Sequence, residues 1–399
     1  MQAETSTSST AGSEDLADRT TPSSSLAQRN FDIAIVGSGI VGSALAYSFA
    51  KSGRSVVLVE RDVSKPDRIV GELLQPGGVR ALKLLGIEDA LEGIDAVPVE
   101  GYEVFYGPRK VPIPYPEETD EYKGGGIDST SGKVEGRSFH HGNFVQSLRR
   151  KAKGMEGVTS LEATVRDLRT DSKGRIIGVE ATRKLSPPSV SPTQEEDITL
   201  SASLTIVCDG CFSKFRRSFG SSIAPRVRSN FVALELTHAP LPSPHFGHVV
   251  LAPSGPILLY QISTEHTRIL IDVAGEKLPS IGKGELQKHI YDNVIPHLPG
   301  ELGATVKEEM DKGQRLRSMP NSFLPPSMQG QRKDRQGVIV VGDAMNMRHP
   351  LTGGEHAYSI SVHSALTDPL SSLRWHVRRS LGRSTPHQRL RRRQVDANS

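Results

Sequence analysis

Four short runs of mostly apolar residues are each followed closely by a glycine or an acidic residue: 32–36, 56–59, 204–207 and 338–341. Runs without polar alternation are typical of strands buried on both faces, as in a parallel sheet. Residues 42–52, between the first two runs, are small and apolar and predict a helix. The ordered part of the chain therefore opens with a β-α-β unit.

The remaining pattern predicts a second, more antiparallel region. Apolar residues at helical spacing predict helices over 71–92, 141–154 and 284–313, the last interrupted at 296–300. Strands are expected over 99–115, in a hairpin over 157–182 that turns at 173–174, and in three runs at 231–237, 247–262 and 268–273. Residues 117–136 and 184–197 are polar and predict loops. The three late runs predict an antiparallel sheet.

Both ends of the chain differ from its centre. Residues 1–30 are rich in Ser, Thr and Ala and are expected to be disordered. Residues 374–399 contain eight arginines and one acidic residue, so the rest of the chain holds 41 basic and 44 acidic residues, and the net charge of +4 reflects this end. We expect no nucleic-acid-binding fold. A solvated basic tail over 357–399 is favoured over one that contacts anionic lipid or RNA.

Cysteine content and hydropathy exclude several classes of protein. The chain has two cysteines, Cys208 and Cys211, which fits a reducing compartment; two ordinary thiols are favoured over a redox pair. No apolar run approaches the roughly 20 residues of a membrane span. The first 30 residues lack an apolar stretch and contain acidic residues, so neither a secretory signal nor a mitochondrial transit peptide is expected.

A glycine motif follows the first predicted strand. The segment 37–42 matches G-x-G-x-x-G, with Ile40 and Val41 in its variable positions, and Glu60 ends the next strand. In this context Gly37 allows a tight turn, Gly39 admits a pyrophosphate to the helix N-terminus, and Gly42 permits close packing. Glu60 is placed to accept hydrogen bonds from a ribose. The motif predicts a dinucleotide site but does not separate FAD from NAD.

Two later strand ends resemble those of the flavoprotein monooxygenase superfamily. One strand ends in Asp209-Gly210 and the other in Gly342-Asp343-Ala344, with Pro350 and Gly353 close behind. The resemblance implies an α/β fold: a Rossmann-like FAD-binding domain of the para-hydroxybenzoate-hydroxylase type with an antiparallel-sheet substrate domain. It also implies that Asp343 binds the ribityl chain of FAD. We assign 31–95, 137–220 and 335–356 to the FAD-binding domain, and 96–136 and 221–334 to the substrate-binding domain.

Longer segments are similar to the squalene monooxygenase (squalene epoxidase) family, over about residues 31 to 354. They are 61–62, 66–78, 101–102, 113–116, 136–142, 317–321 and 342–354. The resemblance implies epoxidation of squalene to (S)-2,3-epoxysqualene with O₂ in sterol or triterpenoid synthesis. It implies FAD as cofactor, electrons from NADPH through a cytochrome reductase, and peripheral attachment to the endoplasmic reticulum membrane. The alternatives are an aromatic-hydroxylase type of FAD monooxygenase or an inactive truncated homologue.

The same resemblance implies roles for particular residues. Gln75 and Tyr102 match family positions near the flavin and are the candidate catalytic residues. Arg61 and Arg68 are candidates for cofactor binding, Arg68 at a phosphate or at the isoalloxazine, and Val165 is a candidate for adenine contact through its backbone. The apolar strands of 231–273 are expected to form walls of the substrate cavity. We expect no metal, because His140, His141 and His349 lack partners at ligand spacing.

The chain departs from the family pattern in three places. Glu355 stands where the family has a glycine, His356 where it has a methionine, and Asn143 where many relatives have an arginine. We predict that the resemblance ends after Gly354, and that a frameshift, retained intron or alternative splice product is the cause. Sequencing of the transcript across the Gly354 codon tests this prediction, since a uniformly spliced message encoding the same tail would reject it.

Overall fold

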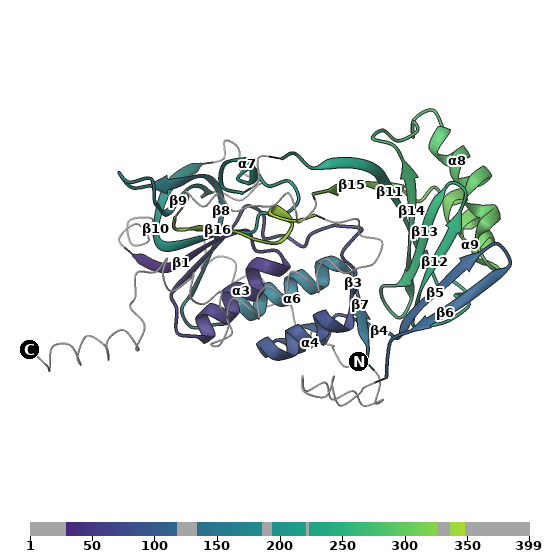
Figure 1. The fold of residues 1–399 in the computed structure, drawn as a ribbon, viewed down its shortest axis with the longest axis horizontal. Coiled ribbons are helices and arrows are strands. Elements are labelled where there is room, and N and C mark those ends of the chain that lie inside the picture. Colours follow the sequence, from purple (N-terminus) through teal and green to yellow (C-terminus); the bar gives the residue numbers. More distant parts are fainter. Residues whose placement is uncertain (1–28, 118–133, 186–193, 221–222, 325–335, 348–399) are drawn as a thin grey trace, which may run out of the picture.

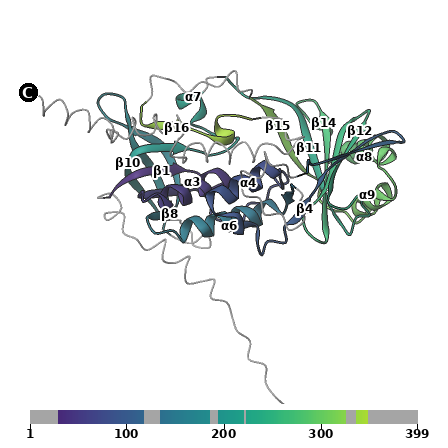
Figure 2. The ribbon, with the colours of Figure 1, turned by 60° about the horizontal axis from the view of Figure 1, so that its bottom comes forward.

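The computed structural model describes residues 29–117, 134–185, 194–220, 223–324 and 336–347. The predictions for most of 1–30, for the loop over 117–136, for Pro350 and Gly353, for Glu355 and His356, and for the basic tail lie outside the described residues. Two large sheets stand side by side, with helices between and beside them (Figures 1 and 2).

The first sheet is built on parallel strands, as the apolar runs predict. Strands β1 (Asn30–Val36), β2 (Val56–Glu60) and β16 (Val338–Val340) join the C-terminal half of β10 (Glu195–Val207) and the N-terminal half of β8 (Val158–Thr170). The order in space is β8-β2-β1-β10-β16, and every one of these pairings is parallel. All the carboxyl ends therefore meet at one edge, where the glycine and aspartate turns lie.

Different structures cover the two faces of this sheet. Helices α3 (Ile40–Lys51), α6 (His141–Lys153) and α4 (Pro76–Leu85) lie on one side (Figure 1). On the other side, β8 and β10 continue beyond the parallel sheet and pair antiparallel with β9 (Ile176–Lys184). Ala34, Val57 and Val340 pack there against apolar residues of this three-stranded extension. The β-α-β unit and the hairpin over 157–182 are confirmed.

The second sheet has seven strands in the order β15-β11-β14-β13-β12-β5-β6. Their bounds are β5 (Gly101–Tyr106), β6 (Arg109–Pro114), β11 (Arg226–Thr237), β12 (Phe246–Ala252), β13 (Gly255–Gln261), β14 (His266–Ala274) and β15 (Arg317–Phe323). The β12–β5 pairing is parallel and the others are antiparallel. These strands fall inside the ranges assigned to a substrate domain, and that division stays a prediction.

One face of the seven-stranded sheet is covered by helices. Helices α8 (Glu285–Asn293) and α9 (Leu302–Asp311), separated by the short 3₁₀ helix η3 (Ile295–His297), pack Leu286, Ile290 and Val306 onto it. The predicted interruption at 296–300 is confirmed. On the opposite face, Phe231, Leu258 and Leu270 pack against Ile69 and Leu73, which lie between β2 and α4. A small sheet of β3 (Leu73–Leu74), β7 (Gly136–Ser138) and β4 (Val97–Val99) lies at this junction (Figure 1).

Three sequence-based element predictions were wrong in extent. The helix over 71–92 is α4 alone, because Leu73 and Leu74 pair with β7, Pro76 begins the helix and Gly86 ends it at φ 72°; the 3₁₀ helix η2 (Glu88–Leu91) follows. The run 247–262 is two strands, because the chain turns before Gly255. Strand β10 begins at Glu195, inside the predicted polar loop, because its polar side chains alternate with buried ones.

Candidate cofactor and substrate site

The glycine turn after β1 is shaped by close backbone contacts. Gly37 has φ 101°, and a Cβ there would lie 2.6 Å from the carbonyl oxygen of Cys208. A Cβ on Gly42 would lie 1.8 Å from the carbonyl oxygen of Gly37. Gly39 caps α3 without a side-chain hydrogen bond, and a Cβ there would meet nothing within 4 Å. The turn thus leaves the N-terminus of α3 open on the side of Gly39, where an anion is stabilised by the helix dipole.

Glu60 lies beside this turn at the end of β2. Its carboxylate accepts a hydrogen bond from the Ser38 amide at 2.7 Å and lies 3.7 Å from the Arg149 guanidinium. Arg149, on α6, also donates to the Ser38 carbonyl at 2.9 Å. One set of polar contacts therefore holds together the glycine turn, α6 and Glu60, the residue predicted to bind a ribose.

One cavity of about 490 Å³ collects most of the predicted cofactor residues. Nine of them line it: Gly37, Gly39, Ile40, Val41, Glu60, Arg61, Arg68, Val165 and Asp343. Gly42 does not line it and packs directly behind the turn. Residues from four strand ends and α3 thus surround a single space, as a site for one extended ligand requires. The role of each residue in binding stays a prediction.

Arg216, which the sequence analysis missed, joins the two aspartate turns. This residue of the short helix α7 (Arg216–Phe219) donates from Nη2 to the carbonyl oxygens of Cys211, at 2.8 Å, and Asp343, at 2.9 Å. Its Nε donates to the Ala344 carbonyl at 2.8 Å. No local pattern identifies such a residue, because its partners in the second turn, Asp343 and Ala344, are more than 120 positions away in sequence.

Asp209 is a second functional candidate that the structure adds. It lines the same cavity, and its Oδ1 is buried with no hydrogen-bond partner among the described residues. Burial raises the pKa of this carboxyl group, and a hydrogen bond from Ser213 opposes the rise. A buried acceptor without a partner is costly, so a ligand hydroxyl that donates to Asp209 would be stabilised there.

The candidate catalytic residues form a separate polar chain. Gln75, the N-cap of α4, donates through Nε2 to the Tyr102 hydroxyl, and the Tyr115 hydroxyl donates to Oε1 of Gln75. Burial raises the pKa of Tyr102. Neither Gln75 nor Tyr102 lines the 490 Å³ cavity. Their pairing, across 27 residues of sequence, shows that the structure brings these two together.

A second cavity of about 780 Å³ adjoins the first and shares Asp67, Arg68 and Phe212 with it. Its apolar lining includes Ile69, Met310 and Met319. The strands of 231–273 contribute no lining residue to either of these two cavities, so the predicted walls are not found there. The apolar side chains of those strands that face the first region pack directly against it instead.

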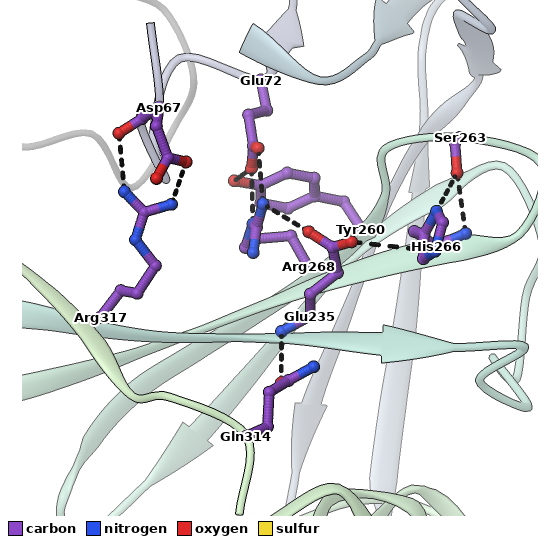
Figure 3. A network of polar contacts seen from close by, with 9 residues as sticks. All are labelled: Asp67, Glu72, Glu235, Tyr260, Ser263, His266, Arg268, Gln314 and Arg317. Carbon is purple, nitrogen blue, oxygen red and sulfur yellow. Dashed lines mark hydrogen bonds and ion pairs between the residues drawn. The ribbon is translucent and has the colours of Figure 1, made fainter. Parts of the chain in front are cut away.

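A buried ion pair connects the segment before α4 to the seven-stranded sheet (Figure 3). Arg268 on β14 donates to both carboxylate oxygens of Glu72 at 2.9 Å, and also to Glu235 at 3.1 Å. The Tyr260 hydroxyl donates to Glu72 at 3.4 Å. Burial raises the pKa of Glu72, and the hydrogen bonds and charge of Arg268 oppose the rise. Two parallel charge-assisted bonds fix the segment before α4 against the second sheet.

The histidines considered for metal binding separate in space. His141 lines the 490 Å³ cavity, where its Nδ1 lies 3.1 Å from the Gly71 carbonyl oxygen. His140 instead faces Glu235 and His266, with the ligand atoms of all three within 4.8 Å of one another. His349 lies outside the described residues. The two thiols are both free, and Cys208 donates to the carbonyl oxygens of Val36 and Gly37.

Two family models match parts of this chain. The family model described as squalene epoxidase matches residues 201–377, and that of FAD-dependent oxidoreductases matches 32–66. The first match continues past Gly354, so the prediction that the resemblance ends there was wrong.

Curated relatives extend the match over most of the chain. The squalene epoxidase of Schizosaccharomyces pombe is 43% identical over 341 residues, covering 85% of this chain and 68% of its own length. Squalene epoxidase 1 of Arabidopsis thaliana is 42% identical over 86% of this chain and 60% of its own length. The squalene monooxygenase of Mus musculus is 42% identical over 81% of this chain and 52% of its own length. The chain thus spans between about half and two thirds of the length of these relatives.

Solved structures agree on the fold. A probable FAD-dependent monooxygenase of Pseudomonas aeruginosa, PqsL, superposes with a TM-score of 0.66 at 18% identity, covering 89% of this chain and 91% of its own. A chondrochloren halogenase from a myxobacterium is described as a variant of FAD-dependent halogenases. It superposes with a TM-score of 0.63 at 18% identity, covering 87% of this chain and 77% of its own. The fold is that of an FAD-binding flavoprotein with an adjoining sheet domain. With this fold and relatives more than 40% identical over most of its length, the chain belongs to the squalene epoxidase family.

Proposed function

We propose that this protein epoxidises squalene to 2,3-epoxysqualene, using FAD, O₂ and electrons from NADPH. The observation that carries the proposal is the 43% identity to a squalene epoxidase over 85% of the chain. The geometry supports it, because nine residues predicted for FAD surround one cavity. Relatives named squalene epoxidase or squalene monooxygenase occur in fungi, plants and mouse.

The residues of the cavity fit FAD. The N-terminus of α3 is open beside Gly39, where the pyrophosphate needs room and backbone amides. Arg61, Arg68, Arg149 and Lys214 line the cavity and supply positive charge for two phosphates. Asp209 offers a buried acceptor without a partner among the described residues, which suits a sugar or ribityl hydroxyl. Glu60 would hold a ribose and Asp343 the ribityl chain.

Side chains of this protein would position both FAD and the alkene substrate. When bound and reduced, FAD supplies the chemistry that activates O₂ for transfer of one oxygen atom to an alkene, the other leaving as water. Arg216 holds the Asp-Gly and Gly-Asp-Ala turns in register, so that both aspartates face the same cavity. Gln75 fixes the Tyr102 hydroxyl, and the raised pKa of Tyr102 keeps that hydroxyl protonated as a donor. The apolar side chains at the junction between the sheets pack against one another and keep water out of that junction.

The partners and the location follow from the family alone. A cytochrome reductase would deliver the NADPH electrons, and the enzyme would act at the endoplasmic reticulum membrane in sterol or triterpenoid synthesis, where its apolar substrate is dissolved. Among the described residues, none of the helices has both the length and the apolar character to cross a bilayer. Peripheral attachment to that membrane, as the family resemblance implies, is the form of membrane contact that we propose.

Reconstitution tests the function. Purified protein is incubated with squalene dispersed in detergent, FAD, NADPH and a cytochrome reductase, and the products are extracted and identified by mass spectrometry. We expect the mono-epoxide, dependent on every component, with no product from the matched Gly39→Ala variant because it lacks bound FAD. A flavin-loaded wild-type protein that forms no epoxide would contradict the proposal. Turnover of a phenol with NADPH and no reductase would favour the aromatic-hydroxylase alternative.

A further inference from the structure

Three potential metal ligands converge where the two sheets meet. His140 is the N-cap of α6, Glu235 lies on β11 and His266 begins β14. Each offers one ligand atom, and these atoms all lie within 4.8 Å of one another. The residues are far apart in sequence, so a local motif does not explain their convergence. All three are half-buried, which leaves room for an ion to enter.

The distances between the three side chains are short enough for one ion to reach them after small movements. Nε2 of His266 lies 3.8 Å from Oε1 of Glu235, as Figure 3 shows. The rings of His140 and His266 lie 5.6 Å apart between centroids and cross at 70°. In a tetrahedral zinc site neighbouring nitrogen and oxygen ligands are about 3.3 Å apart, so small side-chain rotations would close this site.

Neighbouring groups support a metal ligand role for His266. The Ser263 hydroxyl lies 3.0 Å from Nδ1 of His266 and receives the backbone N–H groups of Glu265 and His266. In the tautomer with Nδ1 protonated, this N–H donates to the Ser263 hydroxyl oxygen and holds the ring orientation, as is usual for metal-binding histidines. Nε2, the nitrogen that faces Glu235, is thereby the one presented to an ion.

The local charges leave room for a cation. Arg268 donates two 2.9 Å hydrogen bonds to Glu72 and one of 3.1 Å to Oε2 of Glu235, so two carboxylates share one guanidinium. Oε1 of Glu235 is the oxygen that faces His266 and is available to an ion.

We propose that His140, Glu235 and His266 bind one divalent first-row transition-metal ion, for which Zn²⁺ is the test probe. Two imidazoles and a carboxylate form a ligand set that such ions accept, with a fourth position open to water. The ion would cross-link the start of α6 to β11 and β14. Because α6 also supplies His141 and Arg149 to the cofactor cavity, the ion would act as a structural clamp between the two sheets.

The test uses tag-free, FAD-loaded protein that has been stripped with a chelator. Zn²⁺ is titrated in competition with a chromophoric chelator, and the bound metal is counted by elemental analysis after dialysis. We expect one Zn²⁺ per chain with a dissociation constant at or below the micromolar range. His140→Ala and His266→Ala should each weaken binding at least about tenfold.

Two control variants separate this site from others. His297→Ala removes an exposed histidine on η3, and Cys211→Ser removes a half-buried thiol; both should bind Zn²⁺ as wild type does. Circular dichroism and flavin content establish that each variant is folded. If His266→Ala is unstable, Co²⁺ added to wild type gives a second measurement, since imidazole coordination produces visible d–d bands. Absence of stoichiometric Zn²⁺ in wild type, or undiminished binding in the two ligand variants, would overturn the proposal.

Discussion

The parallel sheet and the seven-stranded sheet are fixed by different kinds of interaction. At the parallel sheet, the cofactor cavity depends on close backbone approach at the strand-end turns, such as that of Gly37 to Gly42 and to Cys208. At the seven-stranded sheet, the position relative to the cofactor region depends on side chains that meet across long sequence separations, such as Glu72 and Arg268, 196 residues apart. Cofactor binding should therefore be sensitive to the addition of a single methyl group at these turns. The stability of the junction between the sheets should be sensitive to the removal of a single charge.

The largest effect is expected where backbone contact is tightest. Gly42→Ala places a Cβ 1.8 Å from the Gly37 carbonyl oxygen, so the turn must distort, and we expect loss of FAD and of several kcal/mol of stability. Gly39→Ala meets nothing within 4 Å and should leave the apoprotein as stable as wild type while still abolishing FAD binding. Flavin absorbance of purified protein and thermal melts of apoprotein measure the two properties. Equal melting temperatures for both variants would contradict the distinction.

The next effect concerns the junction. Glu72→Gln leaves the buried Arg268 guanidinium with the half-buried Glu235 as its remaining counter-charge, and removal of one partner of a buried pair costs up to about 3–5 kcal/mol. Lys288→Ala breaks an exposed ion pair with Asp292 on α8 and should have no measurable effect. Urea unfolding followed by circular dichroism gives both free energies. A Glu72→Gln protein as stable as Lys288→Ala would show that the pair does not hold the sheets together.

A smaller effect is expected on catalysis. Tyr102→Phe removes a hydroxyl that Gln75 holds, and loss of one such hydrogen bond, about 1.4 kcal/mol, corresponds to roughly a tenfold lower kcat. Tyr106→Phe, on the same strand but 67% exposed, is the matched control and should retain full activity. The assay is epoxide formation with saturating squalene. An active Tyr102→Phe enzyme would remove this residue from the candidate catalytic group.

The smallest effect is expected on the pH dependence of stability, through a histidine in the seven-stranded sheet. Burial lowers the pKa of His248 from its usual 6.5, while Glu103 at 3.9 Å opposes the shift. Below about pH 6.5 the unfolded chain therefore takes up a proton that the folded chain does not, and stability decreases as the pH falls. His248→Gln should make that decrease shallower. Phe105→Leu disturbs the same stack without changing titration, so its loss of stability should be the same at every pH.

The contrast also explains which features were predictable from the sequence. The strand-end turns could be predicted, because each needs a particular residue type within a few positions, as at Gly37, Gly39 and Asp343. Leu73 and Leu74 were wrongly placed in a helix, because their spacing suits one and only their pairing with residues 137–138 decides otherwise. Arg216 and the group of His140, Glu235 and His266 were missed for the same reason. Their partners are set by the tertiary fold.

Strand β10 has a consequence for synthesis of the chain. Its last residues pair with β1 across 171 positions, Val36 with Val207. At a synthesis rate of about 5–20 residues per second, the inner edge of β1 stays open for roughly 10–30 s after it leaves the ribosome. The side chains of β1 are mostly apolar on both faces of the strand, and no neighbouring strand covers this edge during the interval. Nascent chains of this protein should therefore bind chaperones until residue 207 has emerged, and ribosome pausing between residues 60 and 200 should increase aggregation.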